Sequence, residues 1–198
     1  MTASIRLALR AATDEDHVML ENTRLMQALS HGEPSRDDYL EYLWRQWDLH
    51  CALESALAPW VPTAWVSERL GKRHWLERDM RALLPAGQVA PTPQAIPLHP
   101  ITSLAEALGT LYVLEGSTLG LRMMEKRFTP GHPGLSVAGR FIQGYGAEHG
   151  LRWKTFLDRL EALPAEDWPS AIVAARATFR TFLDHFAAPA QSHSTVLE

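Results

Sequence analysis

The sequence predicts an all-α, single-domain protein, and three observations support this fold class. Apolar residues recur every three or four positions along most of the chain, which is the period of a helix with one buried face. Ser or Thr followed three residues later by Asp or Glu precedes several of these stretches, and such capping boxes mark helix starts. No region is rich in predicted strands, and no linker divides the 198 residues. A chain that is 46% hydrophobic can bury one sizeable core.

The first helical stretch covers about residues 4–30, with Thr13 and Asp16 as an internal cap. His17 shares a helical face with residues at offsets of three, four and seven, namely Arg10, Thr13, Leu20 and Arg24. Arg10 should lie roughly 10 Å from His17 along the helix axis. A histidine that binds iron and an arginine that pairs with acid groups suit a metal macrocycle whose edge carries carboxylates.

The next helix begins at Ser35, where Ser35 and Asp38 form a capping box. Its apolar face directs five side chains toward a core: Leu40, Leu43, Trp44, Trp47 and Cys51. Another helix is expected over about residues 63–84. Residues 85–100 contain five prolines and no helical period, so they are expected to form a connector.

The segment at residues 111–124 places Gly116 and Gly120 inside a long helix whose start is predicted by Ser103 and Glu106. Gly in a helix interior is roughly 0.8–1.0 kcal/mol less favourable than Ala, so two of them indicate a use for bare backbone. The stripe on which they lie comprises Gly109, Tyr112, Gly116, Gly120, Met123 and Arg127. Such a stripe suits either a flat ligand or a second, closely packed helix.

After a turn at residues 130–134, a helix from about Val137 is expected to bend near Gly144 and Gly146. The last helix covers about residues 171–187. The polar tail that follows, residues 189–198, is expected to be loose. All 198 residues are predicted to form a single domain.

Composition excludes several classes of protein. The net charge of −4 and the 21% charged residues argue against a broad nucleic-acid interface. Cys51 is the only cysteine, so it cannot form an internal disulfide, and this suits a reducing cytoplasm. No apolar run approaches the ~20 residues that cross a bilayer, and the N-terminus lacks the core of a signal peptide. The chain is therefore expected to be cytoplasmic and to bind neither membranes nor nucleic acid.

Two motifs then point to one family. The first is Leu-Arg with Thr13, His17 and Leu-Glu at residues 9–21, and the second is Leu-Tyr-Val-Leu-Glu-Gly-Ser-Thr-Leu-Gly at residues 111–120. Together they resemble the heme oxygenase family, and its bacterial branch in particular. Weaker similarity covers most of the remaining chain, at residues 49–54, at residues 144–148, at Trp153 and Phe156, and around Phe179.

The resemblance implies a multi-helix bundle with heme between a proximal N-terminal helix and a glycine-kinked distal helix. His17 matches the axial ligand of the heme iron, while Gly116 and Gly120 match the distal helix. Ser117 takes the place of an aspartate that orders distal water in animal members, and Leu121 takes the place of another glycine in many members. Other residues are implied to contact heme: Arg10 at a propionate, Tyr112 and Phe179, with Arg127, Arg152 and Lys154 as looser candidates for the propionate role.

The activity implied is the oxidative opening of heme at a meso carbon to biliverdin, CO and ferrous iron. Heme would serve as both substrate and cofactor. Dioxygen and an external electron donor, a reductase or a ferredoxin-type protein, are implied as well. A phytochrome-type protein that accepts biliverdin is a further expected partner.

Two alternatives remain open at this point. A heme-binding carrier or sensor would need His17 but no turnover. A non-heme metal oxidase of the same fold could use His17 with Glu21 and His50 with Glu54, since each pair is spaced four residues apart. Di-iron bundles usually carry Glu-x-x-His motifs, however, and this sequence has none.

Overall fold

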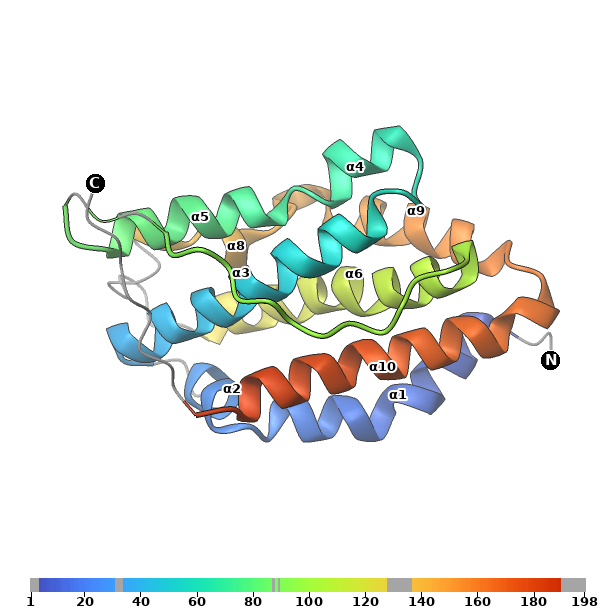
Figure 1. Ribbon diagram of the computed structural model, residues 1–198, viewed down its shortest axis with the longest axis horizontal. Coiled ribbons are helices and arrows are strands. Elements are labelled where there is room, and N and C mark those ends of the chain that lie inside the picture. The colour runs from blue at the N-terminus through green and yellow to red at the C-terminus, as the bar shows by residue number, and fades with distance from the viewer. Residues whose placement is uncertain (1–3, 31–33, 87, 89, 128–136, 190–198) are drawn as a thin grey trace.

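The computed structural model describes residues 4–30, 34–86, 88, 90–127 and 137–189, apart from the side chains at 122, 123, 126 and 127. Every regular element in this part of the chain is a helix, which confirms the predicted all-α class (Figure 1). The turn expected at residues 130–134 and the tail after Pro189 lie outside the described residues. None of the described helices is long and apolar enough to cross a membrane.

The N-terminal stretch forms two helices, α1 (Ile5–Glu21) and α2 (Arg24–Ser30), so the expectation of one helix over residues 4–30 was wrong. The first helix ends at Asn22, and the Thr23 hydroxyl donates to the Leu20 carbonyl at 2.8 Å. Side chains that bond to the last carbonyls in this way compete with helix continuation.

The predicted internal cap in α1 is also absent. The Thr13 hydroxyl donates to the carbonyl of Leu9 at 2.8 Å, within an unbroken helix. Thr13 and Asp16 are both buried, and Asp16 forms an ion pair with Arg176 instead of capping a helix start.

The second predicted helix is present as α3 (Arg36–Leu57). The amide of Asp38 donates to the Ser35 hydroxyl at 3.0 Å, so the capping box is confirmed. All five tryptophans between Trp44 and Trp75 pack, partly buried, against the hydrophobic core.

Residues 63–84 form two helices where one was expected, α4 (Thr63–Arg69) and α5 (Lys72–Leu83). The break falls at Leu70 and Gly71. The flanking cations Arg69 and Lys72 are both buried, and both bind one carboxylate on another helix. This tertiary interaction has no signature in the local helical pattern. The connector over residues 85–100 carries no helix in its described part, as predicted.

The glycine-containing helix is α6 (Leu104–Arg127), and it continues through both central glycines. The amide of Glu106 donates to the Ser103 hydroxyl at 3.2 Å. The Glu106 carboxylate accepts in return from the amide and the hydroxyl of Thr102, at 2.6 and 2.9 Å. The predicted start is therefore confirmed.

The stretch after Val137 is broken, where a single bent helix was expected. It comprises α8 (Arg140–Gln143), the 3₁₀ turn η1 (Gly146–Glu148) and α9 (His149–Glu161). Gly144 and Gly146 adopt φ values of +52° and +57°, which residues other than glycine rarely adopt. These two residues therefore reverse the backbone twist and end the helix.

The C-terminal helix, α10 (Trp168–Ala187), follows the 3₁₀ turn η2 (Ala165–Asp167) and starts three residues before the predicted position. It packs extensively against both α6 and α1, while α1 and α6 make little direct contact with each other. Figure 1 shows α1 and α10 side by side, with α6 adjacent. α10 is thus the common support on which the two helices with the sequence motifs are placed.

Candidate functional site

His17 lies on α1 with an accessible imidazole. Its side chain is 56% exposed, and its Nδ1 atom lies 3.6 Å from a carboxylate oxygen of Glu21. The ring packs edge-on against Phe179 of α10, with 5.8 Å between ring centroids. The neighbouring Asp16 pairs with Arg176 of α10 at 3.3 Å, which fixes α1 next to the histidine. The imidazole is therefore held from one side and open to a ligand.

Gly116 and Gly120 present open backbone on α6. A Cβ atom built on Gly116 would meet only the Trp153 ring, at 3.9 Å, and one built on Gly120 would meet nothing within 4 Å. Among the described residues, no backbone of a second helix comes within 4 Å of either Cβ position, although the Trp153 side chain of α9 approaches Gly116. Of the two explanations for the glycine pair, the geometry favours room for a ligand.

Gly109 has a different role from the other two glycines, so the predicted stripe was only partly correct. A Cβ atom on Gly109 would overlap the carbonyl group of Ala171, lying 2.8 Å from its carbon. Gly109 therefore allows α6 and α10 to cross closely. Small residues at helix crossings commonly serve this purpose.

Tyr112 brings the two sequence motifs together. It is half-buried on α6, with its ring 6.0 Å from that of Trp153. Burial raises the pKa of its phenol, while the nearby charges of Arg6 and Arg10 on α1 oppose the rise. The phenol of Tyr112 is therefore within electrostatic range of Arg6 and Arg10.

Arg6 was missed in the sequence, although a signal existed. It precedes His17 by eleven residues, which is close to three helical turns, so the two share a face of α1. Arg6, Arg10 and His17 form an exposed row on α1.

Ser117 lies beside Gly116, and its hydroxyl donates to the Leu114 carbonyl at 2.9 Å. The next hydroxyl, on Thr118, donates to the Glu115 carbonyl at 2.6 Å. The Ser117 proton is therefore used within the helix, and its oxygen remains available as an acceptor. Leu121 is 4% exposed and packs in the hydrophobic core.

Three other cations named from the sequence are engaged elsewhere. Arg24 belongs to α2 and pairs with Asp38 and Glu41 of α3, so it does not share the helix of His17. Arg152 pairs with Glu148, and Lys154 with Asp158, each four residues away along the chain. The side chain of Arg127 falls outside the side chains that the structure describes.

A buried ion cluster directly adjoins the glycine pair and was also missed. Glu115, which precedes Gly116, is 1% exposed and binds Arg69, Lys72 and Tyr145 at 2.7, 2.8 and 2.8 Å. Burial opposes its charge, yet Lys72 and Arg69 outweigh this effect and lower the pKa of Glu115. A single glutamate within an otherwise apolar and small-residue segment was the available signal.

The two histidine–glutamate pairs do not form a metal site. His17 and Glu21 are exposed on α1, whereas His50 and Glu54 are buried on α3, with His50 Nδ1 3.1 Å from the carboxylate. Over the described ranges, no three His, Cys, Asp or Glu side chains are grouped to hold a metal ion.

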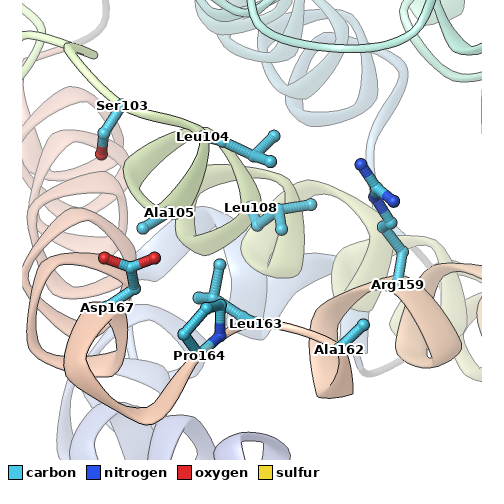
Figure 2. A pocket seen from close by; sticks show the side chains of 9 residues that line it. All are labelled: Ser103, Leu104, Ala105, Leu108, Arg159, Ala162, Leu163, Pro164 and Asp167. Atoms are coloured by element: carbon cyan, nitrogen blue, oxygen red, sulfur yellow. The ribbon is translucent and has the colours of Figure 1, made fainter.

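A cavity of about 230 Å³ lies at the amino end of α6, away from both motifs. Figure 2 shows its lining, which includes Ser103, Leu108, Arg159 and Asp167. It contains no histidine and none of the glycines. Its lining therefore lies outside both sequence motifs.

Comparison with known proteins gives a consistent result. The sequence model described as Heme oxygenase matches residues 3–188 of the chain. A protein named Heme oxygenase from Xanthomonas campestris pv. campestris (strain 8004) is 33% identical over 173 residues, covering 84% of this chain and 99% of that protein.

Three solved structures share the fold, each with a TM-score of 0.67. The NO- and CO-bound heme oxygenase from Neisseria meningitidis is 20% identical and covers 98% of this chain and 97% of its own. The heme oxygenase from Leptospira interrogans is 16% identical, with 93% and 99% covered. The heme oxygenase-1 from Synechocystis sp. PCC6803, solved in complex with heme, is 13% identical, with 93% and 91% covered.

Proposed function

Because the chain belongs to the heme oxygenase family, we propose that α1 and α6 hold heme between them. The protein is a heme oxygenase, an enzyme that opens heme to biliverdin, CO and iron, with heme as both substrate and cofactor. Two observations support this site: the imidazole of His17 on α1 is accessible, and the backbone at Gly116 and Gly120 on α6 is open. All 198 residues would form one catalytic domain.

His17 is the axial ligand of the heme iron in this proposal. Its accessible ring, supported by Phe179, fits the role of a neutral imidazole ligand. His50 is a poor competitor because it is 1% exposed and bound to Glu54. Phe179 fixes the orientation of the imidazole through the edge contact.

The heme propionates would pair with Arg10 and Arg6, beside Tyr112. A guanidinium group can bind a carboxylate through two parallel hydrogen bonds, so these cations would fix the rotation of heme in its plane as well as add affinity. The phenol of Tyr112 can donate a further hydrogen bond. Arg127 stays a candidate for the same edge.

The backbone at Gly116 and Gly120 would lie against the face of heme opposite His17. With no side chain there, a flat ring can approach the backbone closely, and the remaining space restricts where dioxygen can lie. The hydroxyl oxygen of Ser117 would accept a hydrogen bond from an ordered water that supplies protons. Heme itself supplies the redox chemistry once reductant and dioxygen are present.

Electrons would come from an external reductase or a ferredoxin-type protein, and a phytochrome-type photoreceptor could accept the biliverdin. Both partners are compatible with a cytoplasmic location, which we propose as well. The lone cysteine is consistent with this compartment, since no internal disulfide can form.

The direct test is to mix the purified protein with hemin and ascorbate under air. We expect loss of the Soret band, growth of the red absorption of biliverdin, and release of CO. A stable complex that binds one hemin per chain and never changes under reductant would instead identify a carrier or sensor. If the protein bound no hemin at all, the proposed heme site would be wrong.

A further inference from the structure

The ion cluster centred on Glu115 joins several separate segments of the fold. Its carboxylate accepts from three donors on three separate segments: Arg69 of α4, Lys72 of α5 and Tyr145 between α8 and η1. Buried ion pairs seldom stabilise a protein more than apolar packing of similar volume, because removing charges from water is costly. What such a cluster can supply is a fixed geometry.

The donors are themselves held in place, so they form a rigid reference for α6. Arg69 is 2% exposed and its guanidinium lies over the Trp65 ring, 4.4 Å from the centroid. Lys72 is equally buried and also donates to the Arg69 carbonyl at 3.3 Å. The Tyr145 ring is flanked by Lys72, at 5.3 Å, and by Arg152, at 4.9 Å.

The cluster also reaches the residue that faces the first glycine. A second nitrogen of Arg69 donates to the carbonyl of Arg152 at 3.1 Å. The next residue, Trp153, carries the ring that lies nearest to Gly116. One guanidinium therefore links the residue before Gly116 on α6 with the residue before Trp153 on α9.

We infer that Glu115 is a positioning residue, which sets the rotation and height of Gly116 and Gly120 over heme and thereby selects the meso edge that is opened. This inference rests on the heme site proposed above. Successive residues of a helix are rigidly coupled, so a carboxylate held from three directions fixes the adjacent glycine. Glu115 acts through the backbone and does not touch heme.

Two variants test the role. Glu115→Gln removes the charge and keeps the shape, whereas Tyr145→Phe removes one donor and leaves both cations paired. Asp79→Asn is the matched control, because Asp79 is also a buried carboxylate, on α5, which accepts from the amides of Arg140 and Phe141. It contacts neither glycine nor the cluster in the described part of the chain.

Each protein is loaded with hemin, and three properties are compared: the axial-histidine absorption spectrum, the infrared C–O stretching band of the CO complex, and the ratio of biliverdin isomers. For Tyr145→Phe we expect an unchanged histidine spectrum, a shifted C–O band, and a rise of about threefold in the minor isomers, since one hydrogen bond to the carboxylate is lost. Glu115→Gln should show larger changes in the same direction. Asp79→Asn should match the wild type.

The outcomes separate this inference from the proposed function. If the wild type binds hemin and makes biliverdin, but both cluster variants keep its C–O band and isomer ratio, the inference is wrong and the cluster is purely structural. Equal changes in Asp79→Asn would overturn it as well. Should Glu115→Gln fail to fold, Tyr145→Phe alone decides the question. A wild type that binds no hemin would reject the heme site itself.

Discussion

Gly109 of α6 lies directly against Ala171 of α10, so that a Cβ atom on the glycine would fall 2.8 Å from the alanine carbonyl carbon. Two turns further along the same helix, a Cβ atom on Gly116 would meet only the Trp153 ring, at 3.9 Å, and one turn beyond that a Cβ atom on Gly120 would meet nothing within 4 Å. The three glycines therefore serve different purposes within one helix. The first allows two helices to cross, and the other two would leave room for heme in the site proposed above.

The first prediction follows from this contrast. Gly120→Leu should abolish most biliverdin formation, because the new side chain would occupy the space proposed for heme. Folding should be unaffected or slightly improved, since replacing a helical glycine with leucine is worth roughly 0.5–1 kcal/mol in helix propensity. Thermal unfolding and product absorbance, measured on the same preparation, check both statements.

Gly109→Ala is the matched control for the proposed contact of Gly116 and Gly120 with heme. Its methyl group would overlap the backbone of α10, so the two helices must move apart. We expect a loss of about 1–3 kcal/mol in unfolding free energy, as for other overpacked sites. A Gly120→Leu variant that loses stability in parallel with activity, as Gly109→Ala should, would contradict the proposal that Gly120 leaves space for heme.

A second prediction concerns the iron ligand. His17→Ala should lose the axial-histidine absorption spectrum of the hemin complex and all turnover with ascorbate. Little change in stability is expected, because the side chain is 56% exposed. Hemin titration and the unfolding temperature provide the measurements. The control is His74→Ala, an exposed histidine of α5, which should resemble the wild type. An unchanged spectrum in His17→Ala would point to another ligand.

Features set by neighbouring residues were predictable from the sequence. The start of α6 follows from Ser103 and Glu106, which bond within one turn, and the start of α3 follows from Ser35 in the same way. The His17 and Gly120 motifs could also be recognised. The residues that make up each of these signals lie close together in the sequence, so no knowledge of the fold is needed to interpret them.

Features that depend on distant contacts could not be predicted in this way. The break between α4 and α5 is flanked by Arg69 and Lys72, which both bind Glu115 more than forty residues away. Local patterns carry no information about such a partner. The role of Gly109 likewise depends on Ala171 of α10, which is distant in the sequence.

The third prediction is a pH dependence of stability. The pKa of Glu115 is lowered, because Lys72 and Arg69 outweigh the effect of burial, and the pKa of Lys72 is raised, because Glu115 outweighs burial in the same way. A lowered carboxyl pKa stabilises the folded state above the unfolded value of about 4.3, and a raised ammonium pKa stabilises it below about 10.4. The pair therefore contributes fully between these limits.

Glu115→Gln should remove this contribution, at a cost of about 3–5 kcal/mol at neutral pH, since the buried cations lose their partner. The gap in unfolding free energy between wild type and variant should narrow as the pH falls below about 4.3. Denaturant unfolding at a series of pH values measures it. A gap that stays constant down to the lowest pH would mean that Glu115 is uncharged in the folded protein.

Asp79 supplies a control of opposite sign. Burial raises its pKa, although the amides of Phe141 and Arg140 oppose the rise. A raised carboxyl pKa means that the folded state binds the proton more tightly, so stability falls as the pH rises from the unfolded value of about 3.9 through the folded pKa. Relative to wild type, Asp79→Asn should therefore gain stability over that interval. The two buried carboxylates should thus give opposite pH trends.

The last prediction concerns regiochemistry and the cations of α1. The charges of Arg6 and Arg10 both act on Tyr112, so in the proposed site either cation could hold a propionate at that edge of heme. Arg10→Ala should weaken hemin binding by about tenfold, in line with the loss of a charge-assisted hydrogen bond, and should broaden the mixture of biliverdin isomers. Arg10→Lys should restore affinity better than it restores a single isomer, because an ammonium group cannot reproduce a bidentate contact. Arg6→Ala tests the residue that the sequence did not reveal, and Arg78→Ala, an exposed cation of α5, is the control. Chromatography of the extracted product decides among them: wild-type isomer ratios and hemin affinities in both Arg10 variants would make Arg10 a solvated surface residue.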